Sequence, residues 1–505
     1  MAVEKQTLKE YIEERATGKE KESVFLVSPA TDEELTFAKL EKEVSSFSEE
    51  LVKRGAKKGD RVALLLENGI EFAIGFFGTV YAGQVCVPLN LSYKEKELKY
   101  LISDSNARFL LTTKKVFEEK SELLQKAFAF EKDVITDREF VLLRIKEEDN
   151  TGDIPDDLAL ILYTSGTTGN PKGVMLTNGN LIAEAQNVVV AHDLTKEDVA
   201  LGILPLFHIN GLVITLITPL YVGMKLILPP KFSASNFWKW VDRYKVTWFS
   251  GVPTIYSILL SREVDASLSF QSLRFARSAS SALPVAVLEE FEKRYKVPII
   301  ESFGISEGAS QITSNPLPPK VTKPGSVGIP FGNEVRIVDS ENRIMDVNVE
   351  GEIVIRGGNI ALGYWKKEKE TKEAFQNGWF HTGDLGYLDE DGYLFISGRK
   401  KELINRAGEK FSPREIDEVL YQLPQVELAA AVGVPSAMYN EEVVAYIKLR
   451  EKQVLTEEEI INFCRTKLAD FKVPKEIFFT ADFPKGPSGK IQRLKFIDRY
   501  VKKEK

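Results

Sequence analysis

The amino-acid sequence predicts an α/β protein. It would consist of a large N-terminal domain of parallel α/β sheets plus a small antiparallel barrel-like part, and a smaller mobile α+β C-terminal domain. Two observations predict this class. Short apolar runs alternate with helical stretches through the first part of the chain, which is typical of parallel sheets covered on both faces. After Pro330 the runs become hairpin-like, which favours antiparallel pairing.

The expected strands of the large domain are short runs rich in aliphatic and β-branched residues. In chain order they are RVALLL from Arg61, RFLLTT at 108–113, VALGIL at 199–204, MKLILP at 224–229, VTWFS at 246–250 and PIIESF at 298–303. Helical stretches separate these runs, so neighbouring strands are expected to pair in parallel.

The later part of the chain predicts antiparallel strands and then a separate domain. EVRIVD, GEIVIR and YLDEDGYLFIS are expected strands, and the Asp-Gly pair in the last of them is typical of a hairpin turn. A boundary near 398–401 divides the chain into predicted domains 1–398 and 399–505. The second domain is expected to hold a helix at PREIDEVLYQL, strands at ELAAAVGV and EVVAYIKL, and a helix after Thr456.

Composition excludes several classes of protein. With 505 residues, 43% of them hydrophobic, the chain has ample core for two or more domains, and a net charge of −7 without long single-sign blocks argues against nucleic-acid binding. Cys86 and Cys464 lie far apart in apolar surroundings, which favours reduced thiols and excludes a four-cysteine zinc site. No signal peptide or transmembrane segment is expected, so the predicted location is cytoplasmic.

The stretch LALILYTSGTTGNPKGVMLTNGNL, at 158–181, sets an apolar run against a loop of Thr, Ser, Gly, Asn, Pro and Lys. We expect the loop to join a strand to a helix that begins near Leu181, and to bind a polyphosphate through backbone N–H groups, hydroxyls and a lysine. Its candidate ligands are Thr164, Ser165, Gly166, Thr167, Thr168, Gly169 and Lys172. Pro171 stands where a P-loop needs its second glycine, so this is not a Walker motif. A polar surface turn is the alternative interpretation.

Six motifs together resemble the adenylate-forming superfamily, which includes acyl-CoA synthetases, firefly luciferase and the adenylation domains of peptide synthetases. In chain order they are YTSGTTGNPKG, PLFHINGL, ESFGISEGA, WFHTGD, GRKKELINRAGEKFSP and PSGKIQR. The resemblance spans nearly the whole chain. It implies an acid–CoA ligase that uses ATP, Mg²⁺ and coenzyme A, first joining a carboxylic acid to AMP with loss of pyrophosphate and then transferring the acyl group to the CoA thiol.

The resemblance also implies roles for residues of the nucleotide site. Glu307 would bind magnesium, with Thr164 as a second metal ligand, and Ser306 would lie beside the α-phosphate. Phe303 and Gly304 would lie against adenine. The family usually carries Tyr and Thr where this chain has Phe303 and Ser306, which removes one hydroxyl and one methyl group without excluding either role.

Further implied residues act on the ribose, the acyl group and the developing charge. Asp384 would accept hydrogen bonds from the ribose hydroxyls, and Arg399 would reach the sugar or the phosphates. Lys490 would deliver an ammonium group to the adenylation transition state. His208 would lie near the acyl pocket. A turn at Asp384, a solvated Lys490 and a core His208 are the alternatives.

The hinge motif implies a rotation of the C-terminal domain between the two half-reactions. Lys401 occupies the hinge position, and the face around Gly408 would open a path for the pantetheine thiol. A charged flexible linker is the alternative interpretation of this segment.

The acid itself is the least determined part of the prediction. Several stretches resemble a subgroup that includes oxalyl-CoA synthetases, but that subgroup carries histidines where this chain has Asn210 and Ser310. An apolar pocket near Val213, Trp248 and Gly304 would suit a hydrocarbon tail, so a fatty acid is expected. Arg277, if it points into the pocket, would instead hold a second carboxylate.

Alternatives to this function also stay open. They are an oxalyl-type ligase for small acids, an adenylation enzyme that loads a carrier protein, a non-catalytic ATP-binding protein, and, more distantly, a luciferase-like oxygenase. The expected partners are small molecules, with a carrier protein as the alternative acyl acceptor. A homodimer is left open.

Overall fold

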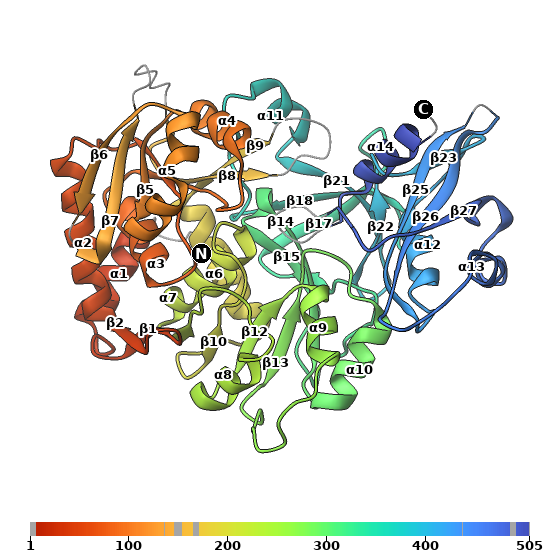
Figure 1. Cartoon of the computed structure of the whole chain (residues 1–505), viewed down its shortest axis with the longest axis horizontal. Helices are drawn as coiled ribbons and strands as arrows, with labels where there is room; N and C mark the ends of the chain where they lie inside the picture. Colours follow the sequence, from red (N-terminus) through yellow and green to blue (C-terminus); the bar gives the residue numbers. More distant parts are fainter. Residues whose placement is uncertain are drawn as a thin grey trace.

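The computed structural model describes residues 7–135, 137–145, 154–164, 171–436, 438–484 and 491–503. Figure 1 shows a large part, coloured from red to teal, and a smaller blue part at the right that contains the C-terminal strands and helices. The predicted α/β class and the division into a large N-terminal and a small C-terminal part are confirmed.

The larger of the two main sheets of the N-terminal part has nine strands. Its strands, from edge to edge, are β16 (Ile329–Pro330), β15 (Ser310–Ser314), β14 (Ile299–Ile305), β13 (Phe275–Ser278), β12 (Trp248–Gly251), β10 (Val199–Leu201), β11 (Lys225–Ile227), β1 (Val24–Ser28) and β2 (Glu33–Thr36). The strands from β14 to β1 are parallel, whereas β2, β15 and β16 pair antiparallel at the two edges.

An eight-stranded sheet has the same mixed character. Its order is β19 (Gly363–Tyr364), β9 (Lys172–Thr177), β8 (Leu158–Thr164), β4 (Val85–Pro88), β3 (Arg61–Leu64), β5 (Ala107–Thr113), β7 (Phe140–Ile145) and β6 (Phe130–Ile135). Only β8, β4, β3 and β5 are parallel. The prediction of parallel sheets therefore holds for the sheet centres, where both faces are buried, and not for the edges.

Helices lie between and outside the two sheets. The inner layer consists of α1 (Leu8–Thr17), α2 (Phe37–Lys53), α3 (Ile70–Tyr81), α6 (Asn178–His192), the π-helix η2 (Asn210–Ile217) and α7 (Thr218–Val222). The outer helices are α4 (Glu95–Ser105) and α5 (Lys114–Ala127) on the eight-stranded sheet, and α8 (Phe237–Tyr244), α9 (Pro253–Leu260) and α10 (Val285–Tyr295) on the nine-stranded sheet. Short 3₁₀ turns are η1 (Asp137–Glu139), η3 (Ser306–Gly308) and η4 (Asp470–Lys472).

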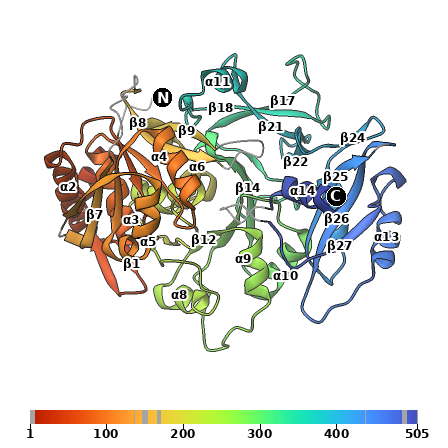
Figure 2. The same ribbon diagram turned by 45° about the horizontal axis from the view of Figure 1, so that its top comes forward.

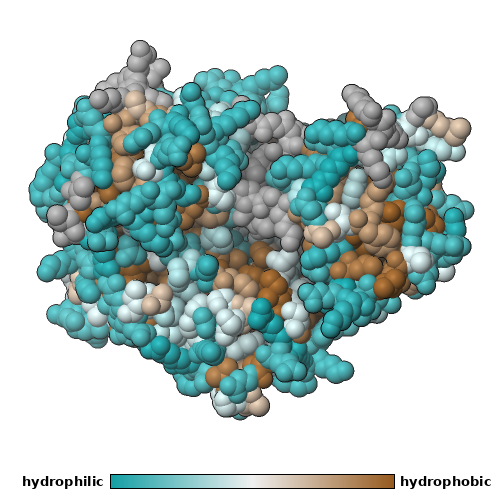
Figure 3. Space-filling model, viewed as in Figure 1, coloured by the Kyte–Doolittle hydropathy of each residue, from teal (hydrophilic) through white to brown (hydrophobic). Residues whose placement is uncertain are grey.

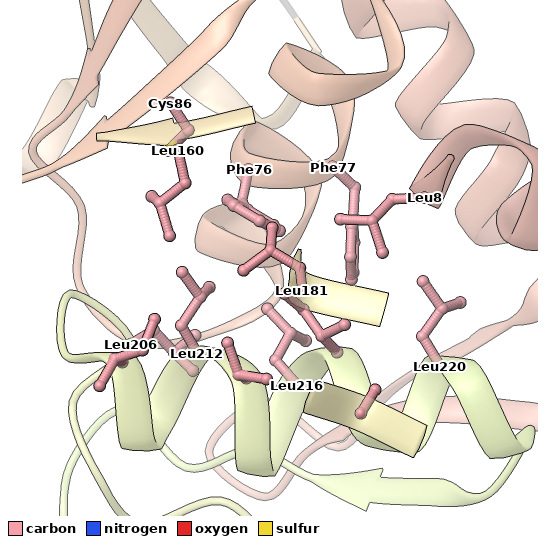
Figure 4. Packing of buried hydrophobic residues seen from close by; sticks show 14 of the residues in the cluster. Leu8, Phe76, Phe77, Cys86, Leu160, Leu181, Leu206, Leu212, Leu216 and Leu220 are labelled. Carbon is pink, nitrogen blue, oxygen red and sulfur yellow. The ribbon is translucent and has the colours of Figure 1, made fainter. Parts of the chain in front are cut away.

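The inner core fixes the π-helix against its neighbours. Leu212 and Leu216 of the π-helix and Leu220 of α7 recur every four residues, and Figure 4 shows Leu216 on the side of Leu181 and Leu220 on the side of Leu8. All five side chains are buried. The residues around Asn210 lie at the start of this helix, so the packing of its leucines also fixes their backbone.

A smaller antiparallel sheet follows the large sheets in the chain. It contains β17 (Asn333–Val338), β18 (Gly351–Gly357), β20 (Phe375–Gln376), β21 (Trp379–Leu388) and β22 (Leu394–Arg399), and α11 (Glu368–Ala374) precedes β20. The predicted Asp-Gly hairpin joins β21 to β22, and Gly392 supplies the positive φ of +79° that the turn requires. This confirms the expected antiparallel strands after Pro330.

The C-terminal part is an α+β unit with a core on each face of its sheet. The sheet contains β23 (Ile404–Arg406), β24 (Glu409–Phe411), β25 (Val426–Ser436), β26 (Asn440–Leu449) and β27 (Glu476–Phe479), covered by α12 (Pro413–Leu420), α13 (Glu457–Arg465) and α14 (Arg493–Lys503). Figure 2 shows α14 lying along β25. Since β22 ends at Arg399 and β23 begins at Ile404, the change of sheet lies beside the predicted boundary at 398/399, which stays a prediction.

The surface and the cysteines agree with the composition. Figure 3 shows a face that is mostly hydrophilic, with scattered hydrophobic patches. Cys86 and Cys464 are free, buried and in different cores. Among the described residues, no helix is long and apolar enough to cross a membrane.

Candidate active site

The glycine-rich loop lies between two strands of a hairpin. β8 pairs antiparallel with β9, and Thr164 faces Lys172 at the end where the loop begins, with the Thr164 hydroxyl 3.5 Å from the Lys172 carbonyl oxygen. The predicted strand-to-helix connection is therefore wrong. The run from Lys172 to Thr177 is extended because Val174 and Leu176 point into the core, and α6 begins only at Asn178, where Thr177 caps it.

This correction changes how the loop would bind an anion. A loop between strands receives no helix dipole, so its donors would be its backbone N–H groups, its hydroxyls and Lys172. Its residues at 165–170, which include the predicted ligands Ser165, Gly166, Thr167, Thr168 and Gly169, lie outside the described residues, and their roles stay predictions.

Tyr364 connects the lysine of this hairpin to the predicted magnesium ligand. The Lys172 Nζ atom lies 4.7 Å from the centre of the Tyr364 ring, and the Tyr364 hydroxyl donates a 2.8 Å hydrogen bond to Glu307 Oε1. Burial and the charge of Glu307 raise the pKa of Tyr364 well above its ordinary value, so the hydroxyl stays a donor. Sequence reasoning missed Tyr364, because its Gly-Tyr-Trp segment carries no signal that it lies beside Glu307.

Hydrogen bonds to two successive carbonyl oxygens hold the turn that carries Glu307. Glu307 lies in η3, between β14 and β15, and its carbonyl oxygen accepts a hydrogen bond from the Ala361 amide at 2.8 Å. The Asn359 side chain donates to the Gly308 carbonyl oxygen at 2.8 Å. Ser306 and Glu307 are half-buried, which leaves part of each side chain accessible at the carboxyl end of β14, the usual place for ligands in α/β sheets.

Phe303 and Gly304, which precede η3 on β14, are closely surrounded by other parts of the protein. Phe303 is 7% exposed and belongs to the inner core, so its ring has little free surface. At Gly304 a Cβ atom would lie 1.5 Å from the carbonyl oxygen of Ser310, so the close approach of the neighbouring strand requires glycine. Their predicted contacts with adenine stay predictions.

Asp384 and Arg399 form an ion pair across β21 and β22. They are directly opposite in the antiparallel register, and Arg399 Nε donates to Asp384 Oδ1 at 2.6 Å. Burial alone would lower the pKa of Arg399, but Asp384 and, more weakly, Glu307 raise it. The two predicted ribose ligands are therefore brought together.

His208 lies just before the π-helix η2. It is half-buried, and the centre of its ring lies 5.0 Å from that of Phe207. Its carbonyl oxygen accepts a hydrogen bond from the Leu212 N–H at 2.8 Å. A Cβ atom on Gly211 would lie 2.2 Å from the Pro205 carbonyl oxygen, which explains the glycine in this motif. π-Helical turns are frequent at functional sites.

The predicted hinge and path residues are at the surface. Lys401 is exposed in the turn between β22 and β23, and Gly408 is exposed with a φ of +95°. Neither is brought into the group around Glu307 by a described contact. Lys490 lies outside the described residues, so its catalytic role stays a prediction.

The donor set fits magnesium in the manner of nucleotide enzymes. Among the described residues there is no group of three or more His, Cys, Asp or Glu side chains placed to hold a metal ion. Mg²⁺ usually takes only one or two protein oxygens, together with substrate phosphates and water. Glu307, with the Thr164 hydroxyl as the second predicted ligand, suits that pattern.

Comparisons with known proteins agree with this geometry. Residues 12–365 match the family model of AMP-binding enzymes, and residues 415–490 match the model of the AMP-binding enzyme C-terminal domain. The structure of ATP-bound MatB from Rhodopseudomonas palustris has a TM-score of 0.88 and 28% identity to this chain, and the match covers 99% of this chain and 100% of that chain.

Relatives of known name are similar over almost the whole chain. The oxalate–CoA ligase of Arabidopsis thaliana is 40% identical over 93% of this chain and 94% of its own length. The sulfoacetate–CoA ligase of Cupriavidus necator is 40% identical over 94% of each chain. The long-chain-fatty-acid–CoA ligase of Bacillus subtilis is 32% identical over 88% of this chain and 86% of its own length.

Proposed function

We propose that this chain, which belongs to the AMP-binding enzyme family and is an AMP-forming acid–CoA ligase, activates a short carboxylic acid rather than a fatty acid. The ligase uses ATP, Mg²⁺ and coenzyme A. The expectation of a fatty acid depended on an apolar pocket near Val213, Trp248 and Gly304.

The packing around these residues carries the proposal. Val213 and Trp248 are both 0% exposed, so neither lines a space that admits even a water molecule. The Trp248 ring stacks on Phe275, with their centres 5.8 Å apart. A long hydrocarbon tail would have to displace these side chains from a packed core, whereas a short acid would not. The greater identity to the oxalate and sulfoacetate ligases than to the long-chain ligase supports the same conclusion.

In the first half-reaction an oxygen of the acid's carboxylate attacks the α-phosphorus of ATP, and pyrophosphate leaves. The obstacle is repulsion between anions, so positioned cations and donors provide the catalysis. Lys172 would bind the departing phosphates, while Tyr364 orients Glu307. Mg²⁺, when bound, would neutralise phosphate charge at Glu307. The pair Asp384 and Arg399 would hold the ribose.

In the second half-reaction the CoA thiol sulfur attacks the acyl carbonyl carbon, and AMP leaves with the electron pair of the broken acyl–phosphate bond. We assign the change between the two half-reactions to a rotation of the C-terminal part at Lys401, after which Lys490 would be withdrawn. The face around Gly408 would then admit the thiol.

The test is product identification over a panel of acids. The full chain is incubated with ATP, Mg²⁺ and acetate, butyrate, octanoate, oxalate, malonate or sulfoacetate, with and without CoA. We expect AMP, pyrophosphate and the acyl thioester from short acids, with octanoate much slower. Pyrophosphate without any CoA thioester would favour a carrier protein as acceptor, and octanoate as the best acid would restore the fatty-acid interpretation.

A further inference from the structure

Arg277 is a fully buried cation whose hydrogen-bond acceptors are neutral. It lies on β13 and is 1% exposed. Its Nη1 atom donates to Asn210 Oδ1 and to Ser250 Oγ, both at 3.1 Å, and its Nε atom donates to Gln311 Oε1 at 3.2 Å. Burial lowers the pKa of Arg277 to about 10, which leaves it charged at neutral pH. A buried charge normally has a hydrogen-bonded counter-charge, so this arrangement requires an explanation.

The two amides that contact Arg277 each have an unused donor. Their oxygens accept from Arg277, which turns both amide nitrogens away from the guanidinium group. Asn210 Nδ2 and Gln311 Nε2 are buried and have no hydrogen-bond partner. The residues are 7% and 1% exposed. Buried donors without acceptors are uncommon in native proteins, and two of them beside one buried cation suit an anionic acceptor.

The position of the cluster agrees with a place beside the predicted acyl site. Asn210 lies two residues after His208, and Gln311 is directly opposite Gly304 in the pairing of β14 with β15. Arg277 is opposite Ser250 in the pairing of β12 with β13, one residue before both strands end. Ligand sites gather at such strand ends.

The alternative is that Glu184 already balances the charge of Arg277. Glu184 is fully buried, and its oxygens accept hydrogen bonds from the backbone N–H of Gln311 at 2.5 Å and from Asn359 Nδ2 at 2.9 Å. Its influence on Arg277 is electrostatic. Burial raises the pKa of Glu184 to about 8 and lowers that of His192, which lies 3.1 Å from Gln311 Oε1, to about 3. Burial thus favours the uncharged forms of Glu184 and His192, and Glu184 makes no described hydrogen bond to Arg277.

We propose that Arg277, Asn210 and Gln311 form a subsite for a second anionic group of the acid, a carboxylate or sulfonate that is not activated. This inference rests on the proposed function and names its substrate class as short dianionic acids. The oxygens of the second group accept hydrogen bonds from Asn210 Nδ2 and Gln311 Nε2, and the guanidinium group supplies the charge. Arg277 and Gln311 are each 1% exposed and Asn210 is 7% exposed, so the anionic group reaches the two amide donors from the Asn210 side, and the Asn210 side chain rotates to admit it.

Asn210→Asp tests the subsite with little change of shape. The substitution keeps the oxygen that accepts from Arg277 and Ser250, but it replaces the donor with a second oxygen of a carboxylate. We expect kcat/KM for malonate to fall by about 100-fold or more, because the new charge repels the ligand and neutralises Arg277. For butyrate, which has an ethyl group in place of the second carboxylate, we expect less than about a fivefold change. Gln311→Glu is the second variant, with the same expectation.

Asn236→Asp is the matched control, because Asn236 is exposed at the start of α8 and the chemical change is the same. Equal losses for malonate and butyrate in both cluster variants, or no loss, would overturn the subsite. The wild-type protein provides a test that needs no variant: conversion of butyrate but not of malonate, oxalate or sulfoacetate would overturn the subsite and leave the ligase intact. Conversion of no acid at all would instead overturn the proposed function.

Discussion

The Tyr364 hydroxyl donates a hydrogen bond to Glu307 Oε1 at 2.8 Å across 57 residues of sequence, while the same ring lies 4.7 Å from the Lys172 ammonium group. One side chain thus touches the lysine expected to bind phosphate and the carboxylate expected to bind magnesium. The ring contact and the hydroxyl contact can be separated by substitution.

Tyr364→Phe removes the hydroxyl and keeps the ring beside Lys172. Hydrogen bonds to charged groups contribute about 1.5–3 kcal/mol, so we expect kcat/KM for Mg²⁺-ATP in adenylation to fall by about tenfold or more. Tyr364→Ala, which also removes the ring, should lose more. The measurement is pyrophosphate release at varied ATP and Mg²⁺, and wild-type kinetics in the Phe variant would show that Glu307 is positioned without Tyr364.

Asp384→Asn tests the ribose site. The amide oxygen of asparagine can still accept a hydrogen bond from Arg399. The negative charge that would strengthen hydrogen bonds from the two ribose hydroxyls is lost. We expect the KM for ATP to rise about tenfold, while the KM for the acid changes little. Thermal unfolding of the variant is the control for a loss of fold. An unchanged KM for ATP would limit Asp384 to pairing with Arg399.

Lys401→Pro tests the hinge. Proline fixes φ at this exposed turn position. The neighbouring backbone hydrogen bonds do not use the Lys401 N–H and can persist. They run from the Lys400 N–H to the Gly383 carbonyl oxygen and from the Glu402 N–H to the Arg399 carbonyl oxygen. We expect acid-dependent pyrophosphate release to continue while CoA-dependent turnover falls by about 100-fold or more. Lys401→Ala is the control, and normal turnover in the Pro variant would remove the hinge assignment.

The sequence predicted the elements whose signals are local. VTWFS became β12, the Asp-Gly hairpin formed with Gly392 at positive φ, and Thr456 caps α13. These features depend on residues within a few positions of one another, so patterning and turn chemistry were sufficient to find them. Asp384 and Arg399 were assigned to the ribose by the resemblance of their motifs, and the ion pair between them was not predicted.

Features that depend on distant pairing were not predictable. β9 was missed because its short run reads equally well as the start of the helix that follows, and only pairing with β8 makes it extended. Tyr364 and the neutral acceptors of Arg277 come from elements that the fold alone brings together. The expected pocket at Val213 and Trp248 was inferred from apolarity, which cannot distinguish a packed core from a cavity wall.

Glu184→Gln tests the buried acid through pH. Burial raises the pKa of Glu184 from its ordinary 4.5 to about 8, so the folded state favours its protonated form. The stability this gives is fully present below about pH 4.5 and is lost as the pH rises through about 8. Thermal unfolding should show the wild-type advantage over Glu184→Gln shrinking between pH 5 and pH 8.5. A constant difference over that range would mean that Glu184 does not titrate there.

Lys490→Ala separates the half-reactions by chemistry. If Lys490 stabilises only the adenylation transition state, acyl-AMP formation should fall by about 100-fold or more, as for the loss of one well-placed donor. Thioester formation from supplied acyl-AMP and CoA should survive. Equal loss of both half-reactions would show a structural role for this lysine.

The most direct measurement of the central claim is the ratio of kcat/KM for a short acid to that for octanoate, at equal ATP, Mg²⁺ and CoA. Each rate is followed as acyl-CoA formed together with AMP. We expect a ratio above about 100, because a long tail must displace the packed Val213 and Trp248 at a cost of several kcal/mol. A ratio below one, with kcat/KM rising as the alkyl chain grows, would contradict it.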